Sequence, residues 1–357
     1  MTSRVARAPG RVNLIGDHTD YTGGLVFPMA IDRYTDLRFE ASDRIELVSA
    51  DEPEPVSLPR DVDDPTIVSP AWGRYVAGVV SELRPRHGIR GSITTTIPIG
   101  GGMSSSHALE VAVALALGFD GTTVELAQLT QRAENRASGV PTGIMDQFSI
   151  AAGVAGHALL MDCAALTVTP VPLPDDIEIV VRFIAQRTLV GSAYADRVAE
   201  CAAAERVVGP LRSAERADLR AIADPVVRHR AEHVVAENQR VIHFAAALRS
   251  HDLRAAGELM VASHISLRDL YDTSTPTMDA AVEGLMATAG VYGARMTGGG
   301  FGGCVVALTE PGALDDGWVV RAVDGARLLD TDQAEEARTS LAPVQKVTRI
   351  GGRPCPT

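Results

Sequence analysis

The sequence predicts an α+β protein, because strand-like and helix-like segments are segregated along the chain. Strand-like runs with a few amphipathic helices fill residues 1–183, a helical pattern covers residues 192–270, and a β-branched strand ends the glycine-rich segment 293–308. A regular βαβ winding would alternate the two types instead. A length of 357 residues suffices for two domains. We place them at residues 1–175 and 176–357, with a proline-rich stretch at the boundary.

In the first domain, strands are expected to precede most helices. A dense polar loop that ends in two glycines, residues 17–24, separates the first two strands. The expected strands are residues 4–16, 25–31 and 36–58, with more in the alternating segment 156–183. The expected helices are residues 70–83 and 123–137, and a buried helix that follows a turn in segment 141–148.

In the second domain, the helical region is expected to break at Pro210 and Pro225. The glycine-rich segment Gly298–Gly303 then matches the GxGxxG dinucleotide fingerprint in form. A dinucleotide site needs an apolar strand before the glycines and a helix after them. Residues 294–297 do not read as such a strand, and a strand follows. We therefore expect a tight turn or a close backbone approach there.

Composition and charge exclude several classes of protein. A net charge of −12 disfavours a nucleic-acid partner. No apolar run reaches the length of a membrane span, and no signal-peptide pattern is seen, so we expect a cytoplasmic protein without a membrane partner. The four cysteines form no CxxC pair, which suits reduced thiols: Cys163, Cys201, Cys304 and Cys355. We expect a monomer or a weak dimer.

The clearest candidate site combines a strand, a glycine turn and a helix. Residues 91–98 read as a β-branched strand, three glycines follow at 100–102, and a helical pattern begins after three serines at 104–106. Unpaired N–H groups at a helix start attract anions, and glycines let the backbone approach one. The pattern therefore indicates a phosphate-binding loop that is not a Walker A motif. A plain turn with a serine N-cap is the alternative.

Other polar residues have structural alternatives as well. Asp146 is placed to cap the helix that it opens. Glu134 reads equally as a surface carboxylate on a helix. Asp17, His18 and Asp20 have the side chains of metal ligands, although no fourth partner is visible in the sequence.

Four segments, taken together, resemble the galactokinase branch of the GHMP small-molecule kinases. They are Arg11 to Tyr21, Pro98 to Glu110, Gly143 to Gln147, and Gly293 to Cys304. They occur in the family's order over almost the whole chain, which makes the resemblance specific. It implies a two-domain α+β fold, with an N-terminal ribosomal-S5-like domain, a C-terminal ferredoxin-like domain and an active site in the cleft between them.

The resemblance implies a kinase that uses ATP and Mg²⁺ to phosphorylate the anomeric C1 hydroxyl of a sugar, with galactose as the expected substrate. By motif match, Asp146 is the catalytic base and Arg11 stabilises charge beside it. Ser106 and Glu134 would bind Mg²⁺. The remaining implied contacts are phosphate contacts at Gly100, Gly101, Gly102, Ser104, Ser105 and Ser106, an adenine-side contact at Trp72, and sugar contacts at Asp17, His18, Asp20, Gly143 and Tyr194.

Several positions depart from the family pattern, among them Asp17, Thr22, His107, Thr277 and the segment 184–187. Asp17 stands where galactokinases usually carry Glu, and His107 stands where they carry a small residue. The shorter acid withdraws its carboxylate by about 1.5 Å from the C6 end of the sugar. A kinase for a C6-modified or higher-carbon sugar is therefore one alternative. A catalytically silent sugar sensor is another, and the presence of all four catalytic and metal-binding residues favours an enzyme over it.

Overall fold

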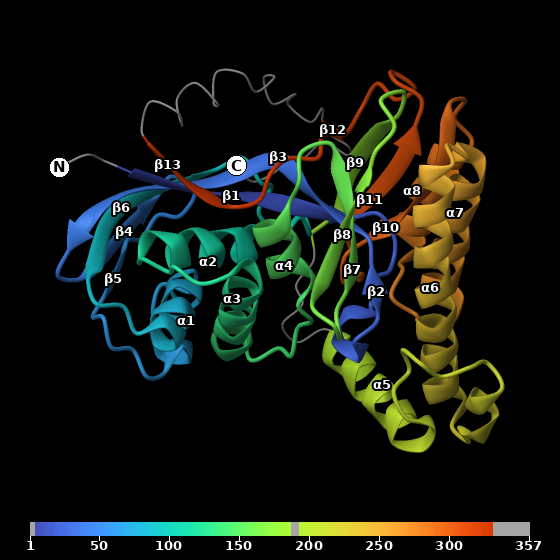
Figure 1. The fold of residues 1–357 in the computed structure, drawn as a ribbon, viewed down its shortest axis with the longest axis horizontal. Coiled ribbons are helices and arrows are strands. Elements are labelled where there is room, and N and C mark those ends of the chain that lie inside the picture. Colours follow the sequence, from blue (N-terminus) through green and yellow to red (C-terminus); the bar gives the residue numbers. More distant parts are fainter. Residues whose placement is uncertain (1–3, 187–192, 331–357) are drawn as a thin grey trace.

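A computed structural model describes residues 4–186 and 193–330 and confirms the predicted α+β fold (Figure 1). Residues 331–357, which include Cys355, lie outside the described residues. The helices are α1 (Gly73–Leu83), α2 (Ser105–Ala116), α3 (Thr123–Ser138), α4 (Met145–Ala152), α5 (Tyr194–Val208), α6 (Pro225–Arg249), α7 (Leu253–Asp269) and α8 (Pro276–Met286). The strands are β1 (Arg4–Asn13), β2 (Leu25–Val26), β3 (Pro28–Ser42), β4 (Ile45–Ser49), β5 (Val56–Leu58), β6 (Gly88–Thr95), β7 (His157–Asp162), β8 (Thr167–Pro172), β9 (Glu178–Ala185), β10 (Val291–Thr297), β11 (Gly303–Thr309), β12 (Trp318–Val320) and β13 (Arg327–Asp330).

The N-terminal half is built on a sheet in the order β13-β1-β3-β6-β4-β5. Its neighbouring strands are antiparallel, except that β4 runs parallel to β6. Strand β13 comes from the far end of the described chain and pairs with β1. Every residue of β1 after Arg4 is buried, so β1 has no solvent-facing side. Arg7 is accommodated there because its guanidinium makes two hydrogen bonds of 2.7 Å to Asp36.

Helices α1 to α4 lie together on one side of this sheet (Figure 1). The helix expected at residues 70–83 begins at Gly73, because Pro70 to Trp72 form a turn. Helix α3 starts with a capping box in which Thr122 and Glu125 satisfy each other's backbone N–H groups. The turn predicted before Asp146 is present, and it leads into α4.

The C-terminal half contains a sheet in the order β10-β11-β9-β12, covered by α7 and α8. A smaller sheet, β2-β7-β8, lies between this sheet and the N-terminal helices (Figure 1). The predicted break at Pro210 is present. The prediction for Pro225 needs correction, because this residue is the first of α6 and Asp224 caps it. A break at residues 250–252, where Asp252 caps α7, was missed.

The glycine-rich segment 298–303 connects two strands. The prediction that residues 294–297 form no apolar strand is wrong, because they belong to β10 and are all buried. Arg295 hides the apolar character of this strand in the sequence. A strand, β11, and not a helix follows the glycines. The Rossmann arrangement is therefore excluded, as the sequence predicted.

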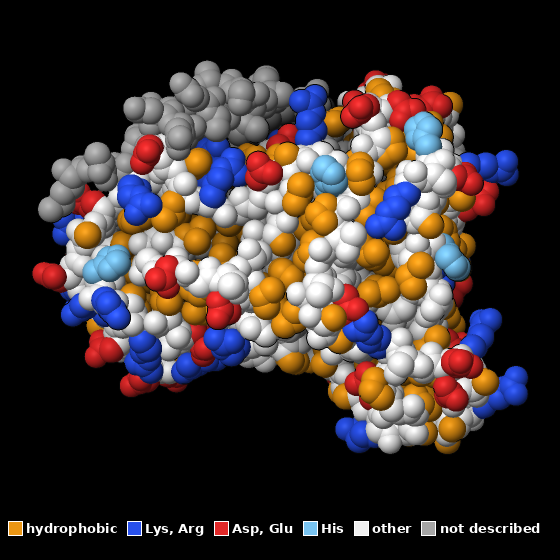
Figure 2. All heavy atoms as spheres, viewed as in Figure 1, with side chains coloured by type: hydrophobic (Ala, Val, Ile, Leu, Met, Phe, Trp, Pro, Cys, Tyr) orange, Lys and Arg blue, Asp and Glu red, His pale blue; other side chains and the backbone are white. Residues whose placement is uncertain are grey.

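One hydrophobic core joins the two halves of the chain. Phe27 of the N-terminal half packs edge-on against Phe244 of α6, with ring centroids 5.4 Å apart. Both belong to a cluster that also contains residues of α2 and β11. On the face in Figure 2, acidic and basic side chains are interspersed. In the described part of the chain, no helix is long and apolar enough to cross a membrane.

Candidate active site

The glycine–serine loop joins β6 to α2, as the sequence predicts. Gly100 and Gly102 have positive φ angles of 72° and 78°, which suit glycine. Ser104 also has a positive φ, 64°, which is uncommon for a residue with a side chain. The loop therefore turns sharply just before α2, and the unpaired N–H groups at the start of that helix meet the cavity that the loop borders.

A cavity of about 320 Å³ lies against this loop. Its lining combines polar residues, among them the loop serines and Glu134, with aromatic and aliphatic side chains such as Trp72 and Ile99. The Trp72 ring is anchored by an Nε1–H bond of 3.0 Å to the Glu54 carbonyl. Among the predicted site residues, those that line the cavity are Trp72, Gly100, Gly102, Ser104, Ser105, Ser106 and Glu134. Gly101 lies in the loop but does not line the cavity.

Asp146 and Arg11 form a partly buried ion pair, with side chains that are 16% and 2% exposed. Arg11 Nε lies 2.6 Å from Asp146 Oδ1, and Arg11 Nη2 lies 2.8 Å from Oδ2. Ser104 Oγ donates a third hydrogen bond, of 2.8 Å, to Oδ2. Burial alone would raise the pKa of Asp146. The charge of Arg11, aided by His107 and Ser104, outweighs it and lowers that pKa to about 2. Asp146 is therefore ionised throughout the neutral range.

Arg11 also connects this pair to the glycine turn. Its Nη1 donates a 2.6 Å hydrogen bond to the carbonyl of Gly102, and its backbone N–H bonds to Met103 O. The imidazole of His107 lies close by, with Nδ1 3.5 Å from Asp146 Oδ2 and 3.3 Å from Ser106 Oγ. A carboxylate, a guanidinium and the loop are thus held in one rigid group.

One buried carboxylate lines the cavity, and a second lies beside it. Glu134 lines the cavity, and Glu110 of α2 is completely buried beside it. Burial, together with the charge of Glu134, raises the pKa of Glu110 well above its ordinary value. Within the part of the chain that the structure describes, both carboxylate oxygens of Glu110 and Oε2 of Glu134 are buried without a hydrogen-bond partner. Unsatisfied carboxylate oxygens beside Ser106 are suitable ligands for a hard cation such as Mg²⁺.

Asp17 is paired with a buried arginine and with the third glycine segment. Its side chain is 1% exposed, and Oδ2 lies 2.6 Å from Nη1 of Arg295, which is fully buried. Oδ1 accepts a 2.9 Å hydrogen bond from Gly298 N–H in the third glycine segment. Burial raises the pKa of Asp17 despite the charge of Arg295. The carboxylate is therefore held inside the protein by β10 and the turn after it.

Asp20 and Gly143 lie against each other. A Cβ on Gly143 would come within 1.8 Å of Asp20 Oδ2, so only glycine leaves room for the carboxylate. Asp20 also accepts backbone hydrogen bonds from Tyr21 and from Met145, the first residue of α4. Burial and repulsion from Asp146 outweigh these bonds and raise the pKa of Asp20 to about 7. The structure thus places Asp20 beside Asp146.

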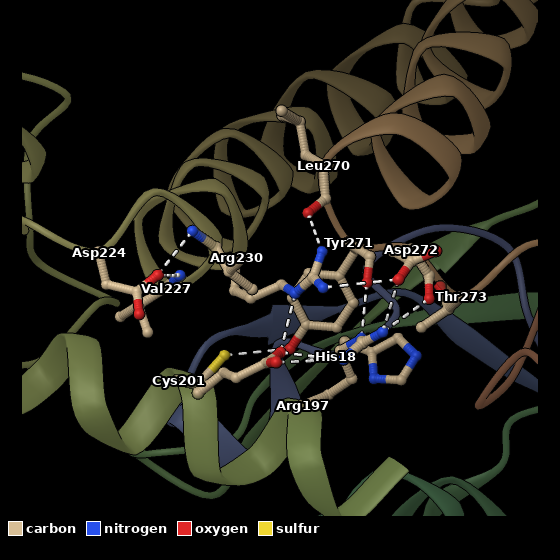
Figure 3. Close-up of polar contacts among 12 residues, drawn as sticks. His18, Arg197, Cys201, Asp224, Val227, Arg230, Leu270, Tyr271, Asp272 and Thr273 are labelled. Carbon is tan, nitrogen blue, oxygen red and sulfur yellow. Dashed lines mark hydrogen bonds and ion pairs between the residues drawn. The ribbon is translucent and has the colours of Figure 1, made fainter. Parts of the chain in front are cut away.

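His18 and Tyr194 meet in an aromatic cluster between the polar loop and α5. Their ring centroids are 5.6 Å apart, and both rings contact Tyr21 edge-on at 5.9 Å. The His18 ring also lies against Tyr271, at 4.7 Å (Figure 3). The alternative of a metal site at Asp17, His18 and Asp20 finds no support. Across residues 4–186 and 193–330, no three His, Cys, Asp or Glu side chains are arranged to hold a metal ion.

Sequence reasoning missed three residues of this region. Glu110 follows Ser106 by four positions and so shares its helix face, a spacing that signals proximity. Arg295 was taken as a reason against a strand, although a lone arginine among buried residues indicates a buried acidic partner. No sequence pattern points to Tyr271 as a site residue, because only the packing of α7 brings it to His18.

Comparison with known proteins agrees with this geometry. Residues 2–37 match the galactokinase galactose-binding signature, residues 74–154 the N-terminal domain of GHMP kinases, and residues 244–318 their C-terminal domain. Human galactokinase is 41% identical over 359 residues, which cover 90% of this chain and 91% of the relative. Galactokinase of Roseiflexus sp. (strain RS-1) is 44% identical over 335 residues, covering 87% and 84%.

Solved structures give the same result. Lactococcus lactis galactokinase complexed with galactose superposes with a TM-score of 0.84 and 32% identity, covering 91% of this chain and 95% of that one. A mevalonate kinase structure, 19% identical with a TM-score of 0.62, covers 91% and 98% and shares the fold. Because its relatives are this similar over nearly their whole length, the chain belongs to the galactokinase family.

Proposed function

We propose that this protein transfers the γ-phosphoryl group of ATP to the C1 hydroxyl of galactose, producing galactose 1-phosphate. The observation that carries the proposal is the Asp146–Arg11 pair, which is hydrogen-bonded through Asp146 to Ser104, a residue that lines the cavity. An ionised carboxylate and a guanidinium at this point serve both partners of the reaction. The carboxylate receives the hydroxyl proton, and the guanidinium faces the charge of the phosphoryl group.

In this mechanism, Asp146 binds the C1 hydroxyl and takes its proton as the new O–P bond forms. A carboxyl group with a pKa of about 2 is a weak base. Proton transfer therefore comes late, when the bond from the γ-phosphorus to the leaving ADP oxygen is largely broken, as a loose transition state requires. The proton then passes to solvent. Most of the rate enhancement comes from positioning and from fixed charges.

The nucleotide occupies the cavity, with adenine toward Trp72 and phosphates along Gly100 to Ser105. Ser106 and Glu134 would hold Mg²⁺, and the unpaired carboxylate oxygens of Glu110 and Glu134 support this assignment. When bound, Mg²⁺ neutralises charge on the phosphate oxygens. Arg11, which contacts the Gly102 carbonyl, contributes a second positive charge.

The sugar lies between the polar loop and α5, with contacts to His18, Asp20 and Tyr194. Gly143 allows the Asp20 carboxylate to reach this position. Similarity to a galactokinase solved with galactose supports galactose as the substrate. Asp17 acts at the C6 end, and its pairing with Arg295 and Gly298 N–H leaves a carboxylate that is held back from the sugar. This observation keeps a C6-modified sugar as the second candidate substrate.

The test is a coupled assay of ADP release with Mg-ATP and a panel of sugars. The panel contains galactose, glucose, galactosamine, galacturonate and a C6-extended heptose, with Asp146→Asn as the inactive control. Galactose should give the highest kcat/KM, and Asp17→Glu should change the ratio between galactose and the heptose. A higher kcat/KM for a C6-altered sugar would replace galactose as substrate. Sugar binding with no ADP release from any sugar would reveal a sensor. The cytoplasmic location and the monomer or weak dimer stay predictions.

A further inference from the structure

The loop after α7 is clamped by two buried arginines from different helices. Arg197 of α5 donates from Nε to the Tyr271 carbonyl at 2.8 Å and from Nη2 to the Asp272 carbonyl at 3.0 Å. Arg230 of α6 donates from Nη1 to the Leu270 carbonyl at 2.6 Å. Three consecutive carbonyls are therefore held by side chains (Figure 3). Such a clamp fixes the backbone of Tyr271 relative to both helices.

From this fixed backbone, the Tyr271 side chain begins a chain of hydrogen bonds that ends on His18. Tyr271 Oη lies 2.5 Å from Tyr21 Oη, and Tyr21 Oη lies 3.0 Å from Nδ1 of His18. On its other side, Tyr271 Oη lies 3.0 Å from Sγ of Cys201. The four polar groups come from the N-terminal loop, α5 and the loop after α7. They link the imidazole to the clamped segment.

Packing prevents the imidazole from leaving this arrangement. Its ring lies 4.7 Å from the ring of Tyr271 and 5.6 Å from that of Tyr194. The opposite neighbour of Tyr271 is His233, at 4.5 Å. Tyr271 is fully buried and His18 is 4% exposed. A ring enclosed in this way keeps Nδ1 toward Tyr21, and Nε2 lies on the far side of the ring.

The direction of the protons follows from the strength of the acceptors. Each phenol has one proton to donate, and the two ends of the chain are an imidazole nitrogen and a thiol. A neutral imidazole nitrogen is a good acceptor, whereas a thiol sulfur is a weak one. Burial raises the pKa of Cys201 to about 12, although the hydrogen bond with Tyr271 lowers it, so the thiol keeps its proton at neutral pH. The favoured chain therefore runs from Cys201 through both phenols to Nδ1.

We propose that Tyr271, acting through Tyr21, is a positioning residue that fixes His18 as the Nε2–H tautomer and directs this N–H to the sugar. An Nδ1 that accepts a proton leaves the ring hydrogen on Nε2. The sugar part of this inference rests on the proposed function. The tautomer part concerns the protein alone. The tyrosine hydroxyls thereby turn His18 into a hydrogen-bond donor of fixed direction.

The first experiment measures the tautomer without sugar. Long-range ¹⁵N–¹H NMR of the full protein at about pH 8, above the ordinary pKa of histidine, distinguishes protonated from unprotonated ring nitrogens. His18→Gln assigns the signals. We expect protonated Nε2 and unprotonated Nδ1 in the wild type, and a mixture of tautomers in Tyr271→Phe and Tyr21→Phe, which keep the rings. A protonated Nδ1 in the wild type, or an unchanged tautomer in both variants, overturns the proposal.

The second experiment measures galactose kinetics. Tyr271→Phe and Tyr21→Phe should each raise KM for galactose about tenfold, with kcat and KM for ATP nearly unchanged, because one oriented hydrogen bond is weakened. Tyr292→Phe, at a distant tyrosine of β10, is the matched control and should match the wild type. An unchanged KM for galactose refutes the presentation of Nε2–H to the sugar. Absence of galactose turnover in the wild type would refute the proposed function. The NMR experiment would still show which ring nitrogen of His18 carries the proton.

Discussion

Replacing Gly143 with alanine should displace the Asp20 carboxylate and little else. The new Cβ would stand 1.8 Å from Asp20 Oδ2, and ordinary contact begins at 3.4 Å, so the carboxylate must retreat by about 1.6 Å. The backbone at this position does not have the positive φ that would itself strain an alanine. A misplacement of about 1 Å at a site can cost about 100-fold in rate. We expect kcat/KM for galactose to fall by about that factor in Gly143→Ala.

A double-mutant cycle with Asp20→Ala tests the cause. If Gly143 serves only to make room for the carboxylate, the alanine at 143 should cost almost nothing once that carboxylate is gone. The assay is ADP release at varied galactose, together with ATP binding by calorimetry, which should stay unchanged in all three variants. An equally large loss from Gly143→Ala in the Asp20→Ala background would refute the reasoning.

Three further predictions follow from the charges. We propose that the ionised form of Asp20 accepts sugar hydroxyls. Since burial raises the pKa of Asp20 to about 7, kcat/KM for galactose should then fall as pH falls through 7. The contribution of Asp20 to folding stability has the opposite sign and is lost as pH rises through 7, so calorimetry should show a higher Tm for Asp20→Asn above pH 7. Arg295→Met leaves the buried Asp17 carboxylate without its cationic partner, so the free energy of unfolding in urea should fall by about 3–5 kcal/mol. Adding Asp17→Asn to the same chain should recover part of this loss. His107→Ala should raise the pKa of Asp146, because His107 helps to lower it; a ¹³C NMR titration of the Asp146 carboxyl group checks this, and an unmoved pKa would show that His107 has no influence.

Local patterns in the sequence determined the glycine–serine loop and the helix that follows it. The β-branched run before Gly100 and the serines after it specify a strand, a turn and a helix start through short-range conformational preferences. The same holds for the capped helix that carries Glu134 and for the turn that leads to Asp146. Periodicity failed where a charge sits inside a strand, as at Arg295, and where a proline begins a helix, as at Pro225.

Only the tertiary structure decided which distant residues meet. Arg11 and Asp146 are separated by 135 positions, and the pairing depends on α4 packing against β1. Arg295 neutralises Asp17 because β10 passes behind the polar loop, and Tyr271 reaches Tyr21 because two arginines clamp its backbone. Motif spacing identifies the kinds of side chain present. Their burial, pKa values and partners depend on contacts between segments far apart in the chain, and no local pattern contains those contacts.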